Sequence, residues 1–316
     1  MRIARLKRGL WSEAVRSLDR DTERSASEAF DRGEHAGAKL FLWQPLRAAV
    51  RTFRGGQSAE AVLAWYRDLV HAAKVWDLER RWREQSAVRF TLGSAHVLAQ
   101  RDWRRVVGRS LLETETGEPL PGGRGGARRV ETEFGPVVVR RFRRGGAMRW
   151  LGDRHFGWRS RPEREFWLLL RALQLGLPVP EPVAAVTEFD GDLVYRGMLI
   201  TVEISGGVPL HEFVAAGHRD ILPPVGRAIR RIHDAGLHHP DLNLGNILVV
   251  PGEEPSLVFI DLDRARLHAA PLGRRSRLRS LQRLRRSARK FDPEGSHLRD
   301  EDLDALQEAY GVARLT

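Results

Sequence analysis

Two short segments in the last third of the chain constrain its fold more than any other feature. The first is His239–Leu248, HPDLNLGNIL, and the second is Phe259–Asp263, FIDLD. Asp241 and Asn246 stand five residues apart in a loop between a helical pattern and a short apolar run, and Asp261 follows the next apolar run, 15 residues after Asn246. Apolar runs of this length predict two short strands. The spacing therefore predicts that two carboxylates and one amide meet where a helix and two strands end.

These three side chains form the set that phosphoryl transfer from ATP requires. A carboxylate must orient the attacking hydroxyl and receive its proton, and oxygen ligands must hold Mg²⁺ against the phosphates. We expect Asp241 to be the catalytic carboxylate, and Asn246 and Asp261 to be the metal ligands, because kinase-like folds bring such residues together at this spacing. A lone His-x-Asp usually lies in a surface turn, so the interpretation depends on the combination.

Three neighbouring side chains have roles that the sequence leaves less defined. Three roles are open for Asp263: it supports Asp261, it binds a second metal ion, or it is an ordinary acid in a loop. We expect His239 to brace the loop rather than to act as an acid or base, and His233 to pack below it.

A glycine-rich loop upstream is the candidate cover for the phosphates of ATP. Thr116–Gly126 contains five glycines and two prolines, which predicts a loop. The alternation over Pro136–Phe142 predicts a strand directly after it. Glycine clusters are more often linkers, but a kinase-type site needs such a loop at this position. Gly123, Gly125 and Gly126 are the residues that we expect to contact ATP.

The cation that holds the phosphates must be an arginine. Only four of the 53 basic residues are lysine, and none of these lies between residues 75 and 289. Arg140 occupies the strand position where a kinase has lysine, and a guanidinium forks onto phosphate and carboxylate oxygens. Its expected partner is Glu165, on a helix that begins at Arg161-Pro162. Arg141 and Glu163 are the alternatives if the strand or the helix faces the other way.

Several further motifs between residues 115 and 300 resemble those of a known family. They are Val139–Gly146 (VRRFRRGG), Asp153–His155, Glu165 and Gly176–Pro180, together with HPDLNLGNIL and IDLDRAR. RRFRRGG is more specific than the general kinase signatures. The set resembles the lipopolysaccharide Kdo kinases (Kdo is 3-deoxy-D-manno-octulosonic acid), which belong to the wider Kdo/heptose kinase group with the protein-kinase-like fold.

This resemblance implies ATP-dependent phosphorylation of a Kdo hydroxyl of inner-core lipopolysaccharide, with a Kdo-containing lipid A precursor as the partner. It implies a cytoplasmic protein, peripheral on the cytoplasmic face of the inner membrane. Family members also carry arginine on the strand, so Arg140 is compatible with an active enzyme. Pro240 and Asn243 stand where protein kinases have arginine and lysine, so protein substrates are not expected.

Residues 1–108 are expected to be helical, because glycine and proline are sparse and apolar residues recur at intervals of three and four. Glu60–Glu84 is the clearest amphipathic segment, and Trp65 and Trp76 are among its apolar residues. Two interpretations remain open. Either the helices pack on the rest of the protein, or their tryptophans and arginines dock at an anionic membrane surface.

A second resemblance covers this N-terminal part. It rests on Leu6–Ala14, Asp19-Arg20, Arg32-Gly33, Pro45-Leu46, Arg54–Gly56 and Ala73–Leu78. These motifs are similar to the C-terminal tail of family-2 glycosyltransferases of lipopolysaccharide core assembly, whose nucleotide-sugar aspartates have no counterpart in this sequence. The resemblance implies a helical membrane-docking remnant, or the back half of a fused transferase and kinase, and leaves a glycosyltransferase partner open.

The net charge of +12 predicts an anionic partner, which is a nucleic acid, a phosphorylated small molecule or an anionic membrane surface. Arg264–Lys290 carries eleven basic residues and no acid, so we expect it to meet phosphates or anionic lipid. Nucleic acid is not expected, because no recognition motif accompanies the charge. Two alternatives to a Kdo kinase remain. One is a kinase of core heptose or of an aminoglycoside-like molecule, and the other is a noncatalytic lipid- or nucleic-acid-binding module.

The order of these patterns predicts the fold class. Cysteine is absent, which excludes disulfide scaffolds and thiol nucleophiles, and no apolar run is long enough to cross a membrane. Strand patterns gather in the first half of the C-terminal part, and helical patterns follow. We expect an α+β protein: a helical region over residues 1–108 and a bilobal kinase-like domain over residues 109–316, with a sheet and one helix in its first lobe and helices in its second.

Overall fold

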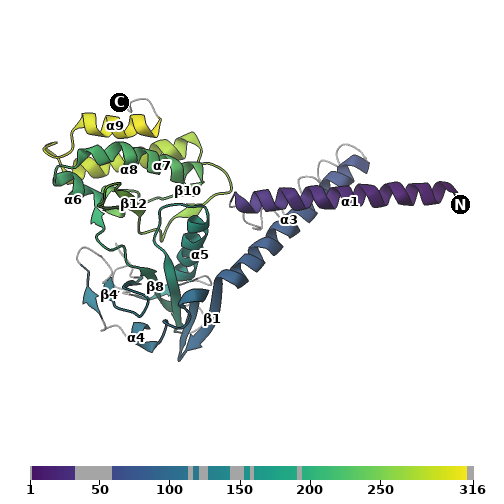
Figure 1. Cartoon of the computed structure of the whole chain (residues 1–316), viewed down its shortest axis with the longest axis horizontal. Helices are drawn as coiled ribbons and strands as arrows, with labels where there is room; N and C mark the ends of the chain where they lie inside the picture. The colour runs from purple at the N-terminus through teal and green to yellow at the C-terminus, as the bar shows by residue number, and fades with distance from the viewer. Residues whose placement is uncertain are drawn as a thin grey trace. The chain divides into compact units, whose positions relative to one another are not determined.

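The structure is a computed structural model that describes residues 2–32, 59–112, 117–120, 127–142, 153–156, 160–190 and 194–311 (Figure 1). The chain divides into two compact units, Met1–Gln85 and Ser86–Thr316, and each is described by itself. No helix in the described ranges has both the length and the apolar character that crossing a bilayer requires.

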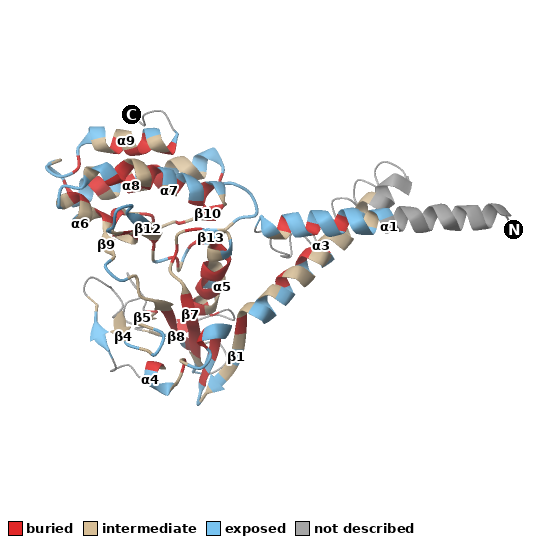
Figure 2. Ribbon diagram, viewed as in Figure 1, coloured by how far each residue is buried: buried red, intermediate tan, exposed pale blue. Residues whose placement is uncertain are grey.

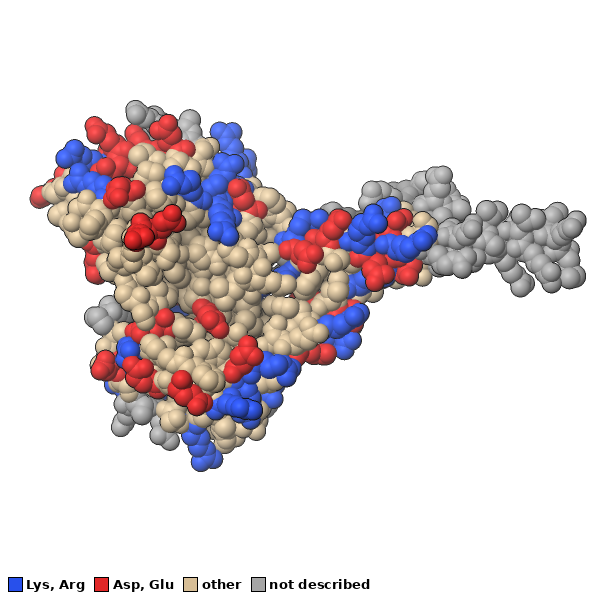
Figure 3. Space-filling model, in the orientation of Figure 1, with Lys and Arg blue, Asp and Glu red and all other residues tan. Residues whose placement is uncertain are grey.

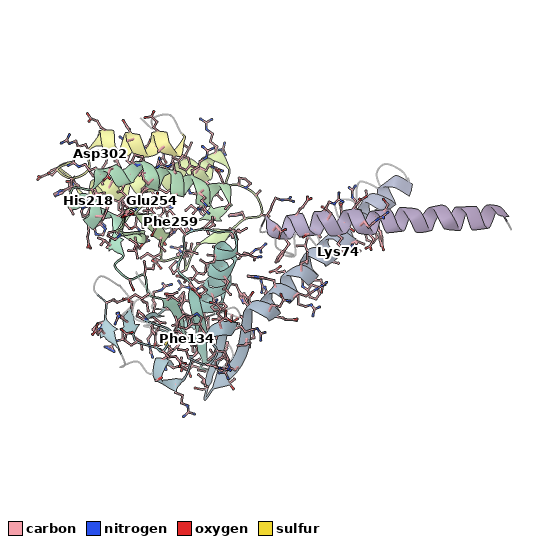
Figure 4. All side chains as sticks on the ribbon, in the orientation of Figure 1. Lys74, Phe134, His218, Glu254, Phe259 and Asp302 are labelled. Atoms are coloured by element: carbon pink, nitrogen blue, oxygen red, sulfur yellow. The ribbon has the colours of Figure 1, made fainter. Side chains whose placement is uncertain are left out.

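The first unit contains two long helices, α1 (Arg2–Asp31) and α3 (Ala59–Ser86). Small side chains mediate their contact, since Ala26 and Ala29 of α1 are fully buried in one cluster with Val75 of α3. An ion pair adds to it: Lys74 Nζ, which is marked in Figure 4, lies 2.7 Å from Asp19 Oδ1. The helical expectation is therefore confirmed for both described segments, which pack on each other.

The second unit begins with an eight-stranded antiparallel sheet in the order β1-β2-β7-β8-β5-β4-β3, with β6 paired to β8. Its strands are β1 (Ala87–Leu92), β2 (Ala95–Gln100), β3 (Glu118–Pro119), β4 (Arg128–Val130), β5 (Val137–Arg141), β6 (His155–Phe156), β7 (Pro182–Phe189) and β8 (Val194–Val202). A short helix, α4 (Arg109–Leu112), follows β2 and its Leu111 joins the core beneath the sheet. The strand expected over Pro136–Phe142 is confirmed as β5.

One helix, α5 (Arg161–Gln174), packs against β7 and β8. It begins where the sequence predicts: the Ser160 hydroxyl accepts the Glu163 N–H, and a proline stands in the first turn. Phe166 and Leu169 are buried on its inner face, and each buried side chain of this size contributes roughly 1.5–3 kcal/mol. Figure 2 shows the buried residues gathered along α5, β7 and β8, so α5 is held firmly on the sheet.

The expectation that residues 1–108 form one helical domain is wrong for residues 87–100. Val88, Phe90 and Leu92 alternate with polar residues, and this period of two forms β1, which turns at Gly93 into β2. Gly93 has φ +63°, a conformation that glycine adopts without strain. Because β2 pairs with β7, both strands belong to the sheet, and the second unit begins at Ser86 rather than at residue 109.

The rest of the second unit is mainly helical. It consists of β9 (Val208–Pro209), α6 (Leu210–Ala215), η4 (Arg219–Ile221), α7 (Leu222–Asp234), β10 (Leu237–His238), η5 (Leu244–Asn246), β11 (Ile247–Val250), β12 (Ser256–Phe259), β13 (Arg266–Leu267), α8 (Arg274–Phe291) and α9 (Asp300–Tyr310). The two short strands expected after the HPDLNLGNIL motif are confirmed, and they pair with each other as β11 and β12. A sheet with one long helix, α5, followed by a helical part is the expected α+β bilobal arrangement.

The contact between α7 and α9 depends on one glycine. A Cβ on Gly226 would overlap the carbonyl oxygen of Leu306, because the two helix backbones approach closely at this point. We expect Gly226→Ala to destabilise the protein by about 1–3 kcal/mol, since the helices must move apart. Chemical denaturation measures this loss. Gly252→Ala is the control, because a Cβ there meets only one backbone oxygen at 3.7 Å; an equal effect of both substitutions would contradict the packing argument.

Candidate active site

The loop between β10 and β11 holds Asp241 by its backbone. The side-chain amides of Asn243 and Asn246 both donate to the Asp241 carbonyl oxygen, at 2.8 and 2.9 Å. Asn243 Oδ1 in turn accepts the N–H groups of Gly245 and Asn246 and caps η5. The Asp241 backbone is therefore fixed, while its carboxylate has no hydrogen bond or ion pair to any described residue. Asp241 therefore has a fixed backbone and a carboxylate that is available to bind a substrate hydroxyl.

Asp261 is connected to this loop from the end of β12. The Ile260 N–H donates to the Asn246 carbonyl oxygen at 3.0 Å, and His239 Nε2 lies 3.1 Å from the Ile260 carbonyl oxygen. Phe259, marked in Figure 4, is the fully buried last residue of β12. Asp261 itself has φ +59°, the only positive φ of a described residue other than glycine. Such a conformation persists only where its surroundings enforce it, and it is common at functional sites.

Arg140 connects the sheet lobe to Asp261. Its Nη2 donates to both carboxylate oxygens of Glu165 on α5, at 2.7 and 2.6 Å, and its Nη1 donates to Asp261 Oδ1 at 3.0 Å. Its guanidinium also lies 4.8 Å from the centre of the Phe142 ring. The planar guanidinium of Arg140 thus links β5 to α5 and to the turn after β12. The single ammonium group of lysine does not reproduce this geometry.

The electrostatics of this pair follow from its burial. Glu165 is 3 % exposed, and the loss of hydration raises its pKa to about 7, against the lowering effect of Arg140 and with a further rise from Asp263 and Asp261. Burial disfavours the charged form of Arg140, but the Glu165, Asp261 and Asp263 carboxylates outweigh it and raise its pKa. The Arg140 charge is therefore permanent, and the charge of Glu165 depends on pH near neutrality.

The alternatives that the sequence left open are resolved by other contacts. Glu163 binds Arg89 of β1 through two hydrogen bonds of 2.9 and 2.8 Å, so it is not the partner of Arg140. Arg141 faces away from Arg140 along β5 and lines a surface pocket with Asp153. Gly123, Gly125 and Gly126 lie outside the described residues, so their expected contact with ATP stays a prediction.

Arg161 and Asp263 form a second connection between the lobes that the sequence did not reveal. Arg161 begins α5 and binds both carboxylate oxygens of Asp263, through Nε at 3.0 Å and through Nη2. Its backbone N–H donates to the Tyr195 hydroxyl at 3.0 Å. Of the roles considered for Asp263, support of Asp261 fits best, because both oxygens are engaged by arginine. The two partners are 102 residues apart, so only the general tendency of arginine to pair with an acid could have indicated them.

The histidines near the loop are structural. Burial lowers the pKa of His239, against the opposing effects of the Ile260 carbonyl and the Asp261 and Asp241 carboxylates, so the ring is neutral at pH 7. His233 is fully buried, its Nδ1 lies 2.9 Å from the Tyr310 hydroxyl, and burial lowers its pKa to about 4. His239 braces the loop, as expected, and His233 packs against α9.

The oxygen atoms near Asp261 suit Mg²⁺. Asn246 uses its Nδ2 for the hydrogen bond to Asp241, which leaves Oδ1 as a ligand, and Asp261 is half exposed with one oxygen on Arg140. Mg²⁺ is typically bound by one or two protein oxygens, and phosphates and waters complete its coordination. No group of three or more His, Asp or Glu side chains in the described ranges is placed to hold a metal by itself. The donor set thus fits a metal bound together with nucleotide.

Helix α8 carries less free charge than its sequence predicts. Arg277 pairs with Asp234 of α7 at 2.6 Å, and Arg285 pairs with Asp300 of α9 at 2.8 Å. Arg289 also lies 3.6 Å from Asp300. Figure 3 shows acidic side chains interspersed with basic ones over this lobe. These three arginines are therefore compensated by acids from other helices, and the expected contact of the segment with phosphates or lipid stays a prediction.

The sheet lobe with its long helix α5, the helical lobe, and the carboxylates, amide and arginine gathered between them match a phosphotransferase of the protein-kinase-like class, which uses ATP and acts on a hydroxyl group. The family model described as "Lipopolysaccharide kinase (Kdo/WaaP) family" matches residues 115–310. The chain belongs to this family.

Curated relatives agree with this assignment. The chain is 36 % identical over 198 residues to the 3-deoxy-D-manno-octulosonic acid kinase of Xylella fastidiosa (strain M12), a match that spans 61 % of this chain and 78 % of the relative. It is 37 % identical over 200 residues to the kinase of the same name from Xanthomonas campestris pv. campestris (strain B100), with the same coverage. A solved structure, WaaP in complex with acyl carrier protein, is 21 % identical with a TM-score of 0.45, covering 66 % of this chain and 84 % of that chain.

Proposed function

We propose that this protein transfers the γ-phosphate of ATP to a hydroxyl of 3-deoxy-D-manno-octulosonic acid (Kdo) in a Kdo-containing lipid A precursor. The observation that carries the proposal is the fork of Arg140 onto Glu165 and Asp261, beside a loop that fixes Asp241 and leaves its carboxylate unengaged. The sugar is proposed from the names of the relatives at 36–37 % identity.

Each residue has a defined task in this proposal. Asp241 orients the acceptor hydroxyl and receives its proton while the oxygen forms its bond to the γ-phosphorus and ADP leaves. Arg140, held by Glu165, positions the phosphates of ATP. Asn246 and Asp261 would hold Mg²⁺ together with the nucleotide, and the ion would neutralise phosphate charge. The backbone of Gly123, Gly125 and Gly126 covers the phosphates, a role that rests on the sequence alone.

The N-terminal unit is proposed to dock on an anionic membrane surface, where a lipid acceptor resides. Tyr66 and Trp76 of α3 are 42 % and 49 % exposed, and Arg80 lies over the Trp76 ring at 5.7 Å. Aromatic rings next to arginine suit the boundary between headgroups and acyl chains. The proposal places the enzyme at the cytoplasmic face of the inner membrane, as a peripheral protein.

A panel of acceptors tests the choice of sugar. Purified protein is incubated with ATP, Mg²⁺ and, in separate reactions, Kdo-lipid A precursor, a core heptose acceptor and an aminoglycoside. We expect phosphate incorporation with the Kdo acceptor at a kcat/KM at least about 100-fold above the others, the discrimination of a site that hydrogen-bonds its substrate. Preference for heptose or the aminoglycoside would contradict the proposed substrate while retaining the kinase mechanism.

The raised pKa of Glu165 predicts a pH dependence. Below pH 7 Glu165 becomes protonated in the folded protein and its pairing with Arg140 weakens, so the KM for ATP should rise as the pH falls from 8 to 6. Stability changes in the opposite sense. Between about pH 4.5 and 7, Glu165 holds a proton in the folded state that it has released in the unfolded state. The contribution of Glu165 to the free energy of unfolding therefore falls as the pH rises from 4.5 to 7.

Glu165→Gln provides the control for this dependence, because its amide keeps the shape of a protonated carboxyl and does not titrate. KM for ATP measured across pH 6–8 should show an inflection near 7 in the wild type that is absent in Glu165→Gln. An inflection of equal size in both proteins would assign the titration to another group, such as ATP itself.

A further inference from the structure

Four basic side chains cluster next to the catalytic loop without a compensating acid. They are His238 of β10, Arg266 of β13, His268 directly after β13 and Arg283 of α8. In the described residues, none of the four has a carboxylate oxygen within ion-pair distance. Arg277, Arg285 and Arg289 on the same helix α8 do have acidic partners, so Arg283 differs from these three arginines.

The pairing of β10 with β13 explains why these side chains converge. The two strands, both marked in Figure 2, are antiparallel. His238 lies opposite Arg266, and Leu237 lies opposite Leu267. Opposite residues have their side chains on one face of a ribbon, and residues two apart along a strand share that face. His238, Arg266 and His268 therefore lie on the same face, and the His238 and His268 rings are 6.3 Å apart.

The backbone keeps this ribbon in place. The His268 N–H donates to the Gly236 carbonyl oxygen at 2.9 Å, and a Cβ on Gly236 would overlap the carbonyl oxygen of His268. Gly236 has φ +84°, so both its conformation and the lack of space require glycine. Leu237 is fully buried on the other face. The basic face is thus presented by a rigid element rather than by a mobile loop.

The charges act on one another. Burial lowers the pKa of His238, and the charges of His268, Arg283 and Arg266 lower it further, with no carboxylate opposing them. The neighbouring positive charges thus disfavour protonation of His238, and a bound anion would relieve that repulsion. His238 is also only three residues before Asp241, which limits the separation of their Cα atoms to about 11 Å.

We propose that His238, Arg266, His268 and Arg283 form a binding site for an anionic group of the acceptor, which holds the acceptor so that its hydroxyl reaches Asp241. This site rests on the proposed function for its ligand. An arginine fork and an imidazole N–H suit the oxygens of a carboxylate or of a phosphate ester. A sugar acid attached to a phosphorylated lipid offers both groups, and the experiment below separates them.

Binding measurements on the full chain test the site independently of catalysis. The probes are Kdo, its uncharged methyl ester and inorganic phosphate, titrated calorimetrically into the wild type, the double variant Arg266→Gln/Arg283→Gln and the control Arg274→Gln. Arg274 is exposed on α8, nine residues before Arg283 and so half a turn away around the helix. We expect the double variant to bind at least one of the two anions tenfold or more weakly than the wild type, and the control to bind them equally well.

The probes identify the group that is bound. Tight binding of Kdo but not of its ester assigns the site to the sugar carboxylate, whereas binding of phosphate alone assigns it to a phosphate ester of the acceptor. Equal affinity of the wild type and the double variant for both anions, or no binding of either, overturns the proposal. His268→Ala is a second variant. We expect it to bind the same anion more weakly than the wild type, with an unchanged secondary structure in circular dichroism.

Kinetics separate this site from the proposed reaction. In the double variant the KM for the acceptor should rise tenfold or more, while the KM for ATP stays within twofold of the wild type. A wild-type protein that binds the anion but phosphorylates no acceptor would contradict the proposed function and leave the anion site intact. A double variant with an unchanged acceptor KM would contradict the site and leave the proposed function intact.

Discussion

Asp241→Asn is expected to lower kcat by at least about 100-fold, because the general base of a phosphoryl transfer contributes a factor of this size or more. The KM for ATP should change little, since the nucleotide contacts in this account come from other residues. The melting temperature should also stay near that of the wild type, because the Asp241 carboxylate has no hydrogen bond or ion pair to a described residue. Steady-state kinetics with thermal denaturation measure all three quantities.

Asn243→Ala is the matched comparison, two residues away in the same loop. Its side chain caps η5 and holds the Asp241 carbonyl, so its removal should cost about 1 kcal/mol of stability as well as activity. The contrast separates a chemical role from a structural one. If Asp241→Asn kept full activity, or lost activity only together with stability, Asp241 would not be the base.

Arg140→Lys is expected to lower kcat/KM for ATP about 100-fold, the loss typical of removing a fixed donor at a phosphate site. Lysine keeps the charge, but its ammonium cannot contact the two oxygens of Glu165 and one of Asp261 as the arginine fork does. A substitution without charge would test less, because it removes the partner of the buried Glu165 and so changes the stability and protonation of the site as well.

Arg141→Lys is the control on the same strand, because its side chain lies on the other face of β5. Its kcat/KM for ATP should stay within about threefold of the wild type, because most substitutions of partly exposed residues outside the active site have small effects. Steady-state kinetics at saturating acceptor compare the two variants. An Arg140→Lys enzyme as active as Arg141→Lys would show that the fork is not needed, and that the phosphates are held elsewhere.

The active-site motifs could be predicted because they are local in sequence. Asp241, Asn246 and Asp261 are linked by short strands and turns, so their spacing alone indicates that they meet. Arg140 on β5 and Glu165 on α5 are 25 residues apart, and the scarcity of lysine singled out arginine. In each case the residues are close enough in sequence that motifs and periodicity indicate which side chains come together.

Other features depend on tertiary contacts that no local pattern carries. β7 escaped prediction because six of its eight residues are buried, so it lacks the alternation of a half-exposed strand. The Arg161–Asp263 pair joins residues 102 apart. The acids that neutralise α8 come from α7 and α9, so the absence of acid within the segment did not mean an absence of acid around it.

The most direct test of the central claim is mass spectrometry of a Kdo-lipid A precursor after incubation with ATP, Mg²⁺ and the full chain. The account predicts that the acceptor gains one phosphate in the presence of the wild type, and that Asp241→Asn, folded to the same melting temperature, leaves it unchanged. An acceptor of unaltered mass after incubation with folded wild-type protein, or equal phosphorylation by the variant, would contradict the central claim.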